Sequence, residues 1–209
     1  MNSDRIYLGL VPLLRGTARS ARRKRAEGFA SEQVAPRNVV FLGDSITERG
    51  DWGEWFPDLG AVNRGIGWDT SEDVLARLDG AIRDPVAVSL LVGTNDLHAS
   101  RHLADLDGIA RRVNQIVTKI QSEAPSAEIF VNAVMPRTTY FAPRIRALNE
   151  HYRAIANQRG CTFVDTWELL ADDAGAIRKI FTIDNLHVSP SGYEAWCAGL
   201  RPLLSPFGA

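Results

Sequence analysis

The stretch Val86–Val92, which reads VAVSLLV, indicates the fold of this chain of 209 residues. Its apolar residues follow one another without alternation, as is typical of a strand that is buried on both faces of a parallel sheet. Four other segments, the second of them weaker, have the same character: residues 39–42, 61–63, 129–135 and 162–165. We therefore expect a parallel sheet of five strands.

Helical patterns occupy the intervals between the expected strands. They cover residues 70–82, 106–120 and 143–158, and a last one starts at Ser189. The first begins with a capping box, Thr70-x-x-Asp73, and the third ends before Gly160, a residue suited to the left-handed turn that closes a helix. The alternation of strands and helices predicts a three-layer α/β/α sandwich with right-handed crossovers, for which we expect a flavodoxin-like strand order.

The composition is that of an ordinary globular protein, with 45% apolar and 23% charged residues. A net charge of −1 lacks the positive field of a nucleic-acid-binding protein, so we predict no nucleic-acid partner. The charge is uneven, because residues 1–37 contain eight Arg or Lys but three Asp or Glu. We expect residues 1–37 to form a basic helical extension of one domain over residues 38–209. The run Arg22–Arg25 lies either on a solvated helix face or against lipid or a partner.

Two features bear on the cell compartment. The apolar segment Ile6–Leu14 has nine residues, too few to cross a bilayer, and basic residues follow it, whereas those of an export signal precede it. We expect no stable membrane insertion. The two cysteines, Cys161 and Cys197, are too few for a disulfide framework and fit either free thiols or a single bridge. Together these features predict a cytoplasmic protein.

Polar residues that are suited to catalysis follow the expected strands. Gly43-Asp44-Ser45 comes directly after the first strand, Asn95 after the third, and Asp184 and His187 after the fifth. Because ligands bind at the carboxyl edge of an open parallel sheet, we expect these side chains to share that edge. A serine nucleophile, a histidine base and an aspartate that orients the imidazole make a catalytic triad, and an asparagine amide can stabilise an oxyanion.

Each of these residues also has a purely structural interpretation. Ser45 suits the N-cap of a helix, and Asn95 suits a turn. The Asp184–His187 pair, taken alone, suits a structural hydrogen bond. Only their shared position at one sheet edge favours the catalytic interpretation.

His98 and His102 stand four residues apart, a spacing that two metal ligands can have. The sequence offers no third ligand of suitable type and spacing, so we expect no metal site. It also lacks a phosphate-binding glycine motif. We therefore expect a protein that uses no cofactor.

Four sequence blocks together resemble the SGNH (GDSL-type) hydrolase family. They are Gly43–Glu48 (GDSITE), Asn63–Thr70 (NRGIGWDT) with Leu75–Leu78, Gly93–Asp96 (GTND), and Asp184–His187 (DNLH) with Gly192-Tyr193. The blocks follow the family's order and spacing across residues 38–203, so the resemblance is specific. The branch that they most resemble contains platelet-activating-factor acetylhydrolase catalytic subunits and lysophospholipase-like bacterial esterases.

The resemblance implies the three-layer fold, an SGNH hydrolase domain over residues 38–209 and a role for each matching residue. Ser45 would be the nucleophile and would donate its backbone N–H to the oxyanion hole, to which Asn95 would donate from its side chain. His187 would act as general base and then as general acid, and Asp184 would orient it.

The chain departs from the family pattern at Trp68. The family usually has glycine at this position, and the backbone N–H of that glycine completes the oxyanion hole. A bulky residue tolerates positive φ poorly, and its indole adds volume beside the site. We therefore expect a narrowed acyl pocket or a reshaped hole, in which Gly67 is the alternative donor to Trp68.

These observations predict a serine esterase that hydrolyses acetyl or other short-chain esters of a sugar or lipid-like alcohol through an acyl-enzyme. Two alternatives stay open: acyl transfer to an alcohol other than water, and a catalytically silent module that binds acylated glycans or lipids. Trp52 and Trp55 either line an aromatic cleft or belong to the core. A homodimer is compatible with the sequence.

Overall fold

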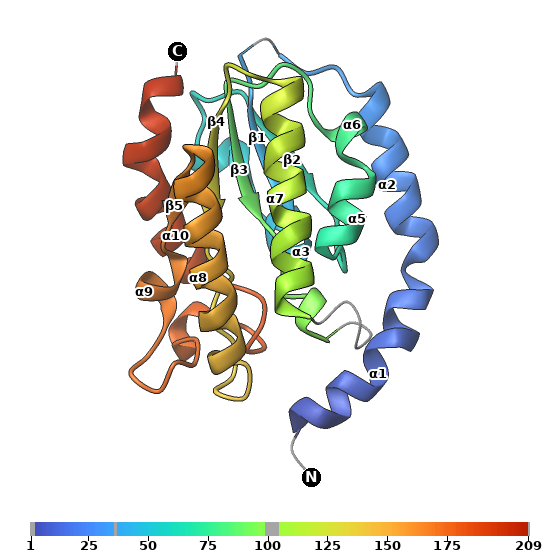
Figure 1. Ribbon diagram of the computed structural model, residues 1–209, viewed down its shortest axis with the longest axis vertical. Coiled ribbons are helices and arrows are strands. Elements are labelled where there is room, and N and C mark those ends of the chain that lie inside the picture. Colours follow the sequence, from blue (N-terminus) through green and yellow to red (C-terminus); the bar gives the residue numbers. More distant parts are fainter. Residues whose placement is uncertain (1–2, 36, 99–104, 209) are drawn as a thin grey trace.

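The computed structural model describes residues 3–35, 37–98 and 105–208. Its centre is a sheet of five parallel strands in the order β2-β1-β3-β4-β5, with helices on both faces (Figure 1). The strands are β1 (Val39–Gly43), β2 (Ala61–Gly65), β3 (Ala87–Leu91), β4 (Glu128–Asn132) and β5 (Thr162–Val164). The predicted three-layer sandwich and its flavodoxin-like strand order are both confirmed.

The longer helices are α1 (Ser3–Thr17), α2 (Arg19–Ser31), α7 (Leu106–Glu123), α8 (Ala142–Arg159) and α10 (Pro190–Leu204). The shorter ones are α3 (Ser45–Glu48), α4 (Trp52–Trp55), α5 (Ser71–Ala76), α6 (Leu78–Ala81) and α9 (Thr166–Leu170), with single 3₁₀ turns at η1 (Asp96–His98), η2 (Lys179–Phe181) and η3 (Ser205–Phe207). Gly160 closes α8 with φ +67°, as its sequence position predicts.

Successive residues of β1 pack into opposite layers of the molecule. Val40 and Leu42 join the apolar cluster that α5, α6, α7 and α8 cover, while Val39 and Phe41 join the cluster on the side of α10. Because both faces of the strand are buried, both sets of positions must be apolar. This arrangement explains why the strand sequences do not alternate.

The helix expected over residues 70–82 is interrupted at Arg77. Its start agrees with the prediction, because Thr70 and Asp73 form a capping box. Arg77 then separates α5 from α6, and its guanidinium turns inwards to the carboxylate of Asp69 at 2.6 Å and to two backbone carbonyls. A tertiary ion pair has here overridden a local helical pattern.

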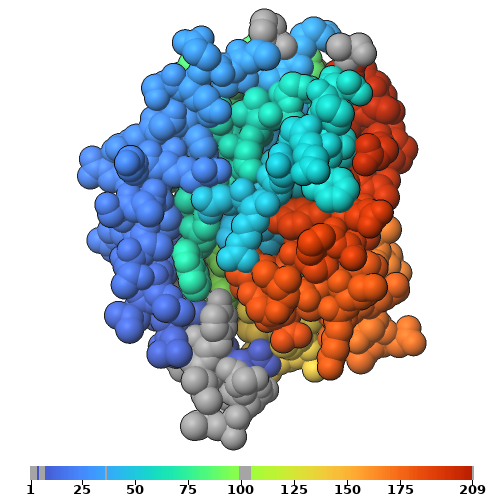
Figure 2. All heavy atoms as spheres, turned by 180° about the vertical axis from the view of Figure 1, so that it is seen from behind, coloured from blue at the N-terminus to red at the C-terminus, as the bar shows by residue number. Residues whose placement is uncertain are grey.

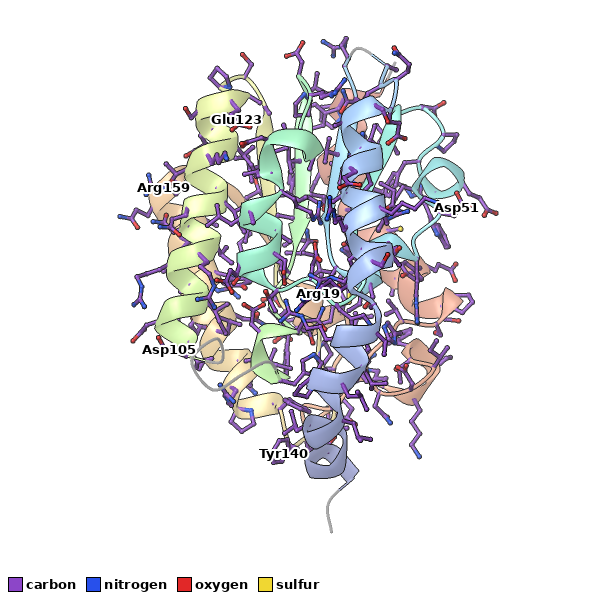
Figure 3. The ribbon with its side chains drawn as sticks, turned by 90° about the vertical axis from the view of Figure 1, so that its right-hand side faces the viewer. Arg19, Asp51, Asp105, Glu123, Tyr140 and Arg159 are labelled. Carbon is purple, nitrogen blue, oxygen red and sulfur yellow. The ribbon has the colours of Figure 1, made fainter. Side chains whose placement is uncertain are left out.

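The two N-terminal helices lie along one side of the molecule: α2 is next to α5 and α6, and α1 continues below them (Figure 1). Phe29 of α2 is buried, and the guanidinium groups of Arg25, Arg64 and Arg77 lie 4.6–5.5 Å from the centre of its ring. Figure 3 faces this side and shows Arg19 where α1 meets α2. These contacts attach α2 firmly to the sheet domain.

In the basic run at the start of α2, some side chains point to solvent and others point towards the protein. Arg23 is exposed, as expected of a solvated helix face, and pairs with Glu27 one turn later. Arg22 and Arg25 are instead turned towards the protein. The expectation of a wholly solvated basic face is therefore wrong for these two arginines, because partners on the sheet domain bind them.

Cys161 and Cys197 are both free thiols, so the interpretation as a single bridge is wrong. Within the described ranges, none of the helices combines the length and the apolar character that crossing a membrane requires.

Candidate active site

Ser45 lies at the carboxyl end of the sheet, where β1 passes into α3. Asp44 caps α3 by accepting the N–H of Ile46 at 2.9 Å. The interpretation of Ser45 as an N-cap is therefore wrong, and its hydroxyl is left for another partner. Gly43 is required at this turn, because a Cβ there would lie 2.2 Å from the carbonyl oxygen of Leu91.

Asp184 and His187 lie in the loop that leads into α10. The carboxylate holds the histidine twice: Oδ2 lies 2.7 Å from Nδ1, and Oδ1 accepts the backbone N–H at 2.7 Å. Asn185, between them, has φ +65°, a left-handed conformation that asparagine adopts more readily than most residues. With its Nδ1 side held by Asp184, the imidazole leaves Nε2 available to another group.

That group is Ser45, whose Oγ lies 3.0 Å from Nε2 of His187. The structure thus brings together Ser45, His187 and Asp184 in one hydrogen-bonded series, although Ser45 and His187 are 142 residues apart in the chain. In this geometry the imidazole can accept the serine proton while the carboxylate stabilises the imidazolium that forms.

The electrostatics of the pair suit proton transfer at neutral pH. Burial lowers the pKa of His187 from its ordinary 6.5, and Arg49 and Arg137 lower it further, against the raising effect of Asp184. The imidazole is consequently neutral at pH 7. Partial burial raises the pKa of Asp184, but the hydrogen bonds from His187 outweigh this effect, so its pKa is lowered and the carboxylate is ionised.

The segment after β2 lies beside the serine and differs from expectation at Gly67. The Gly67 N–H donates to the carboxylate of Glu48 at 2.6 Å, so it is already engaged and is a poor alternative donor to an oxyanion. Trp68 adopts φ +68°, the conformation for which glycine is better suited. Its backbone N–H has no hydrogen-bond partner in the described structure.

Asn95 follows β3, and its amide is held at both ends. Nδ2 donates to the Asp69 carbonyl at 2.9 Å, and Oδ1 lies 2.9 Å from Nε2 of His98. Burial lowers the pKa of His98 to about 3, so this ring is neutral. Arg137 lies 3.4 Å from Nδ1, which indicates that Nε2 carries the proton and donates to Asn95. One amide proton of Asn95 is left for a ligand.

Two further residues next to the site were missed from the sequence. His98 was considered only as a metal ligand, although its Nε2 lies 2.9 Å from Oδ1 of Asn95. Glu48 lies within the quoted GDSITE block, but its contact with Gly67 joins two segments 19 residues apart. The spacing of His98 three residues after Asn95, within one 3₁₀ turn, is the signal that could have found the first contact.

A pocket of about 280 Å³ opens onto these groups. Ser45, Gly67, Trp68, Asn95 and His187 line it on the side of the sheet. The opposite wall comes from α2 and the residue before it, and consists of Ala18, Ala21, Arg22 and Arg25. From behind, the blue N-terminal helices adjoin the cyan segment that contains α3 and β2 (Figure 2).

The other tryptophans near the first block are core residues. Trp52 is 2% exposed and stacks on Phe41, with ring centres 4.0 Å apart, and Trp55 packs against the same cluster. Of the two interpretations, the core one is correct for both. Trp68 alone among these three lines the pocket.

Of the two histidines considered as metal ligands, His102 lies outside the described residues. No group of three or more His, Cys, Asp or Glu side chains within residues 3–35, 37–98 and 105–208 is arranged to hold a metal ion.

Comparison with known proteins places these groups in a family. Residues 41–195 match the GDSL-like lipase/acylhydrolase family. The platelet-activating factor acetylhydrolase IB subunit alpha1 of Rattus norvegicus is 34% identical over 178 residues, which cover 79% of this chain and 74% of the relative.

Solved structures show the same architecture. A Streptococcus pneumoniae protein, whose description refers to a platelet activating factor, has a TM-score of 0.84 and 26% identity, and the match covers 93% of this chain and 97% of that one. A GDSL-like lipase from Bacteroides thetaiotaomicron shares the fold, with a TM-score of 0.77, 20% identity, and coverage of 88% and 97%. The residues matched by the family include Ser45, Asn95 and His187 but exclude α1 and α2.

Proposed function

Because this chain belongs to the GDSL-like lipase/acylhydrolase family and is a carboxylic ester hydrolase, we propose that it is a serine esterase for acetyl and other short-chain esters. One observation carries the proposal: Oγ of Ser45 is 3.0 Å from His187, which in turn is 2.7 Å from Asp184. The small pocket and the name of the rat relative, an acetylhydrolase, support a short acyl group.

In the proposed reaction, Oγ of Ser45 forms a bond to the ester carbonyl carbon while Nε2 of His187 takes its proton. The electron pair of the carbonyl moves to oxygen. The resulting oxyanion accepts hydrogen bonds from the backbone N–H groups of Ser45 and Trp68 and from Nδ2 of Asn95.

The tetrahedral intermediate then collapses, the ester C–O bond breaks, and the alcohol leaves with the proton from His187. A water molecule gives a proton to the same nitrogen and attacks the acyl-enzyme. The acid departs and Ser45 recovers its proton. His98 keeps the Asn95 amide oriented through both steps, because it donates a hydrogen bond to Oδ1. The second proton on Nδ2 is then available to the oxyanion.

A series of p-nitrophenyl esters from acetate to dodecanoate tests this proposal on the purified chain. We expect the highest kcat/KM for the acetate to the butyrate. Brief reaction with the acetate, followed by mass spectrometry of peptides, should find the acetyl group on Ser45. A maximum at eight or more carbons would overturn the short-chain preference. Conversion of added alcohols into new esters, in place of free acid, would favour acyl transfer.

Replacing Trp68 with glycine should widen the range of acyl chains. The indole lines the pocket and the residue adopts φ +68°, so glycine both removes volume and suits the backbone. We expect the octanoate-to-acetate ratio of kcat/KM to rise about tenfold, as burial of about two further methylene groups would give. The same ester series measures this ratio. An unchanged chain-length profile would show that the indole does not limit the acyl group.

The cysteines support a further part of the proposal, which is a cytoplasmic location. Both Cys161 and Cys197 are free thiols, as is usual in reducing compartments.

A further inference from the structure

We propose that the catalytic pocket selects esters whose alcohol part carries an anionic group, and that Arg49 binds this group. The inference rests on the proposed esterase function and adds the class of alcohol. It follows from the position of Arg49, the pairing of the other pocket charges and the side of the pocket from which the alcohol leaves.

Arg49 lies one helical turn after the proposed nucleophile. Its backbone N–H donates to the carbonyl of Ser45 at 3.1 Å and closes α3. Its side chain lines the pocket together with Ser45 and His187. The backbone of Arg49 is thus held one turn from Ser45, and its side chain reaches the same pocket.

The remaining charged side chains of the pocket, apart from His187, are bound to partners. Arg22 pairs with Asp69 at 2.8 Å. Arg25 donates to the carbonyl of Gly65 at 2.7 Å and lies 3.2 Å from Glu48. Glu48 in turn accepts from the N–H of Gly67, as described above.

Arg49 differs from these residues, because its side chain forms no hydrogen bond or ion pair in the part of the chain that the structure describes. Its positive charge is therefore available to a ligand. The planar fork of guanidinium donors fits the two oxygens of a carboxylate or a phosphate.

The position of Arg49 relative to His187 assigns the anion to the alcohol part. Arg49 and His187 line the same pocket beside Ser45, and the arginine charge lowers the pKa of His187. During acylation the departing alcohol takes its proton from Nε2 of His187, so the alcohol must lie on the histidine side of the serine. An anion bound to Arg49 is consequently part of the leaving group.

The positive charge of the N-terminal helices also attracts anionic esters over a longer range than the contact with Arg49. Residues 1–37 carry five more positive than negative charges. Ala18 and the α2 residues Ala21, Arg22 and Arg25 line the pocket. Arg19, labelled in Figure 3, is exposed where the two helices meet, whereas the charge of Arg23 is offset by its ion pair with Glu27. This field favours the approach of anionic esters over neutral ones.

The test compares two acetates of the same aromatic ring, 4-acetoxybenzoate and its neutral methyl ester, at pH 8, where His187 is neutral. We expect the anionic-to-neutral ratio of kcat/KM to fall at least about tenfold in Arg49→Gln, the loss expected for a hydrogen bond to a charged group. Arg49→Lys, which keeps the charge but not the fork, should lose less. The acetate 4-acetoxyphenyl phosphate separates a preference for phosphate from one for carboxylate.

Arg23→Gln is the matched control. It removes the same charge from an exposed position of α2 that does not line the pocket, and it should leave the ratio unchanged. Circular dichroism confirms that each variant is folded. A ratio that is equal in wild type and Arg49→Gln, with both acetates hydrolysed, would overturn this inference alone. Failure of wild type to hydrolyse any of the three acetates would overturn the esterase function and this inference together.

Discussion

Replacing Ser45 with alanine is expected to lower kcat for p-nitrophenyl acetate by about 10⁶-fold, as removal of the nucleophile does in other serine hydrolases. The substitution removes Oγ, which lies 3.0 Å from Nε2 of His187 and is the atom proposed to form the acyl-enzyme. It leaves the backbone of α3 and the Asp44 cap in place, so the free energy of unfolding should change little. Initial rates under saturating substrate measure the effect.

Ser205→Ala provides the control for this experiment. Ser205 lies at the far end of α10, where its hydroxyl contacts the Pro202 carbonyl, and its removal should leave kcat within twofold of wild type. Turnover of the Ser45→Ala protein within a factor of ten of wild type would remove Ser45 from the mechanism. Such a result would show that the reaction does not proceed through an ester of Ser45 Oγ.

Replacing His187 with alanine should also reduce kcat by about 10⁶-fold, because the serine then lacks a base and the departing alcohol lacks an acid. The two losses should not add in the double variant, since both side chains act in the same step. This non-additivity distinguishes a catalytic unit from two independent structural defects. The measurement is kcat for both single variants and the double variant on one ester.

His151→Ala is the matched control, because the His151 side chain is 42% exposed and lies 3.7 Å from Asp107, outside the pocket at Ser45. The pH profile gives an independent check. The lowered pKa of His187 predicts that kcat/KM of wild type falls on the acid side of pH 6.5, as the imidazole gains a proton and ceases to act as a base. A normal rate in His187→Ala would contradict the assignment.

Much of this arrangement could be predicted from the sequence, because it depends on local patterns. Uninterrupted apolar runs such as Val86–Val92 identify strands buried on both faces, and strands separated by helices must pair in parallel. The carboxyl edge of the sheet then collects whatever polar residues follow the strands. The contacts of Ser45 with His187 and of His187 with Asp184 follow from that rule and from the Asp-x-x-His spacing.

The contacts around Gly67 and Asn95 could not be predicted in the same way. The bond from Gly67 to Glu48 and the ring of His98 beside Asn95 depend on side-chain rotamers that tertiary packing selects. The positive φ of Trp68 is likewise imposed by its surroundings, since the residue itself disfavours it. The secondary-structure propensities of individual residues do not predict rotamers or backbone angles that tertiary packing selects.

The N-terminal helices illustrate the same limit on a larger scale. A basic, weakly amphipathic segment suggests a solvated helix, and only the fold reveals that Asp69 and Asp73 pair with Arg22. Through Asp69, whose backbone carbonyl accepts a hydrogen bond from Asn95, α2 is connected to the Asn95 side of the pocket. A segment outside the family match thereby lines the pocket that contains Ser45 and His187.

The separation of 142 residues between Ser45 and His187 has a consequence for how the molecule forms. Every strand pair in the sheet is parallel, so at least one crossover separates the paired strands in sequence, and their contacts are slow to assemble. Helices recover within microseconds of dilution from denaturant. Closing the long loop between Ser45 and His187 costs conformational entropy, so we expect this contact to form last. The return of hydrolysis during refolding therefore times the completion of the chain topology, while far-UV circular dichroism times only its local pieces.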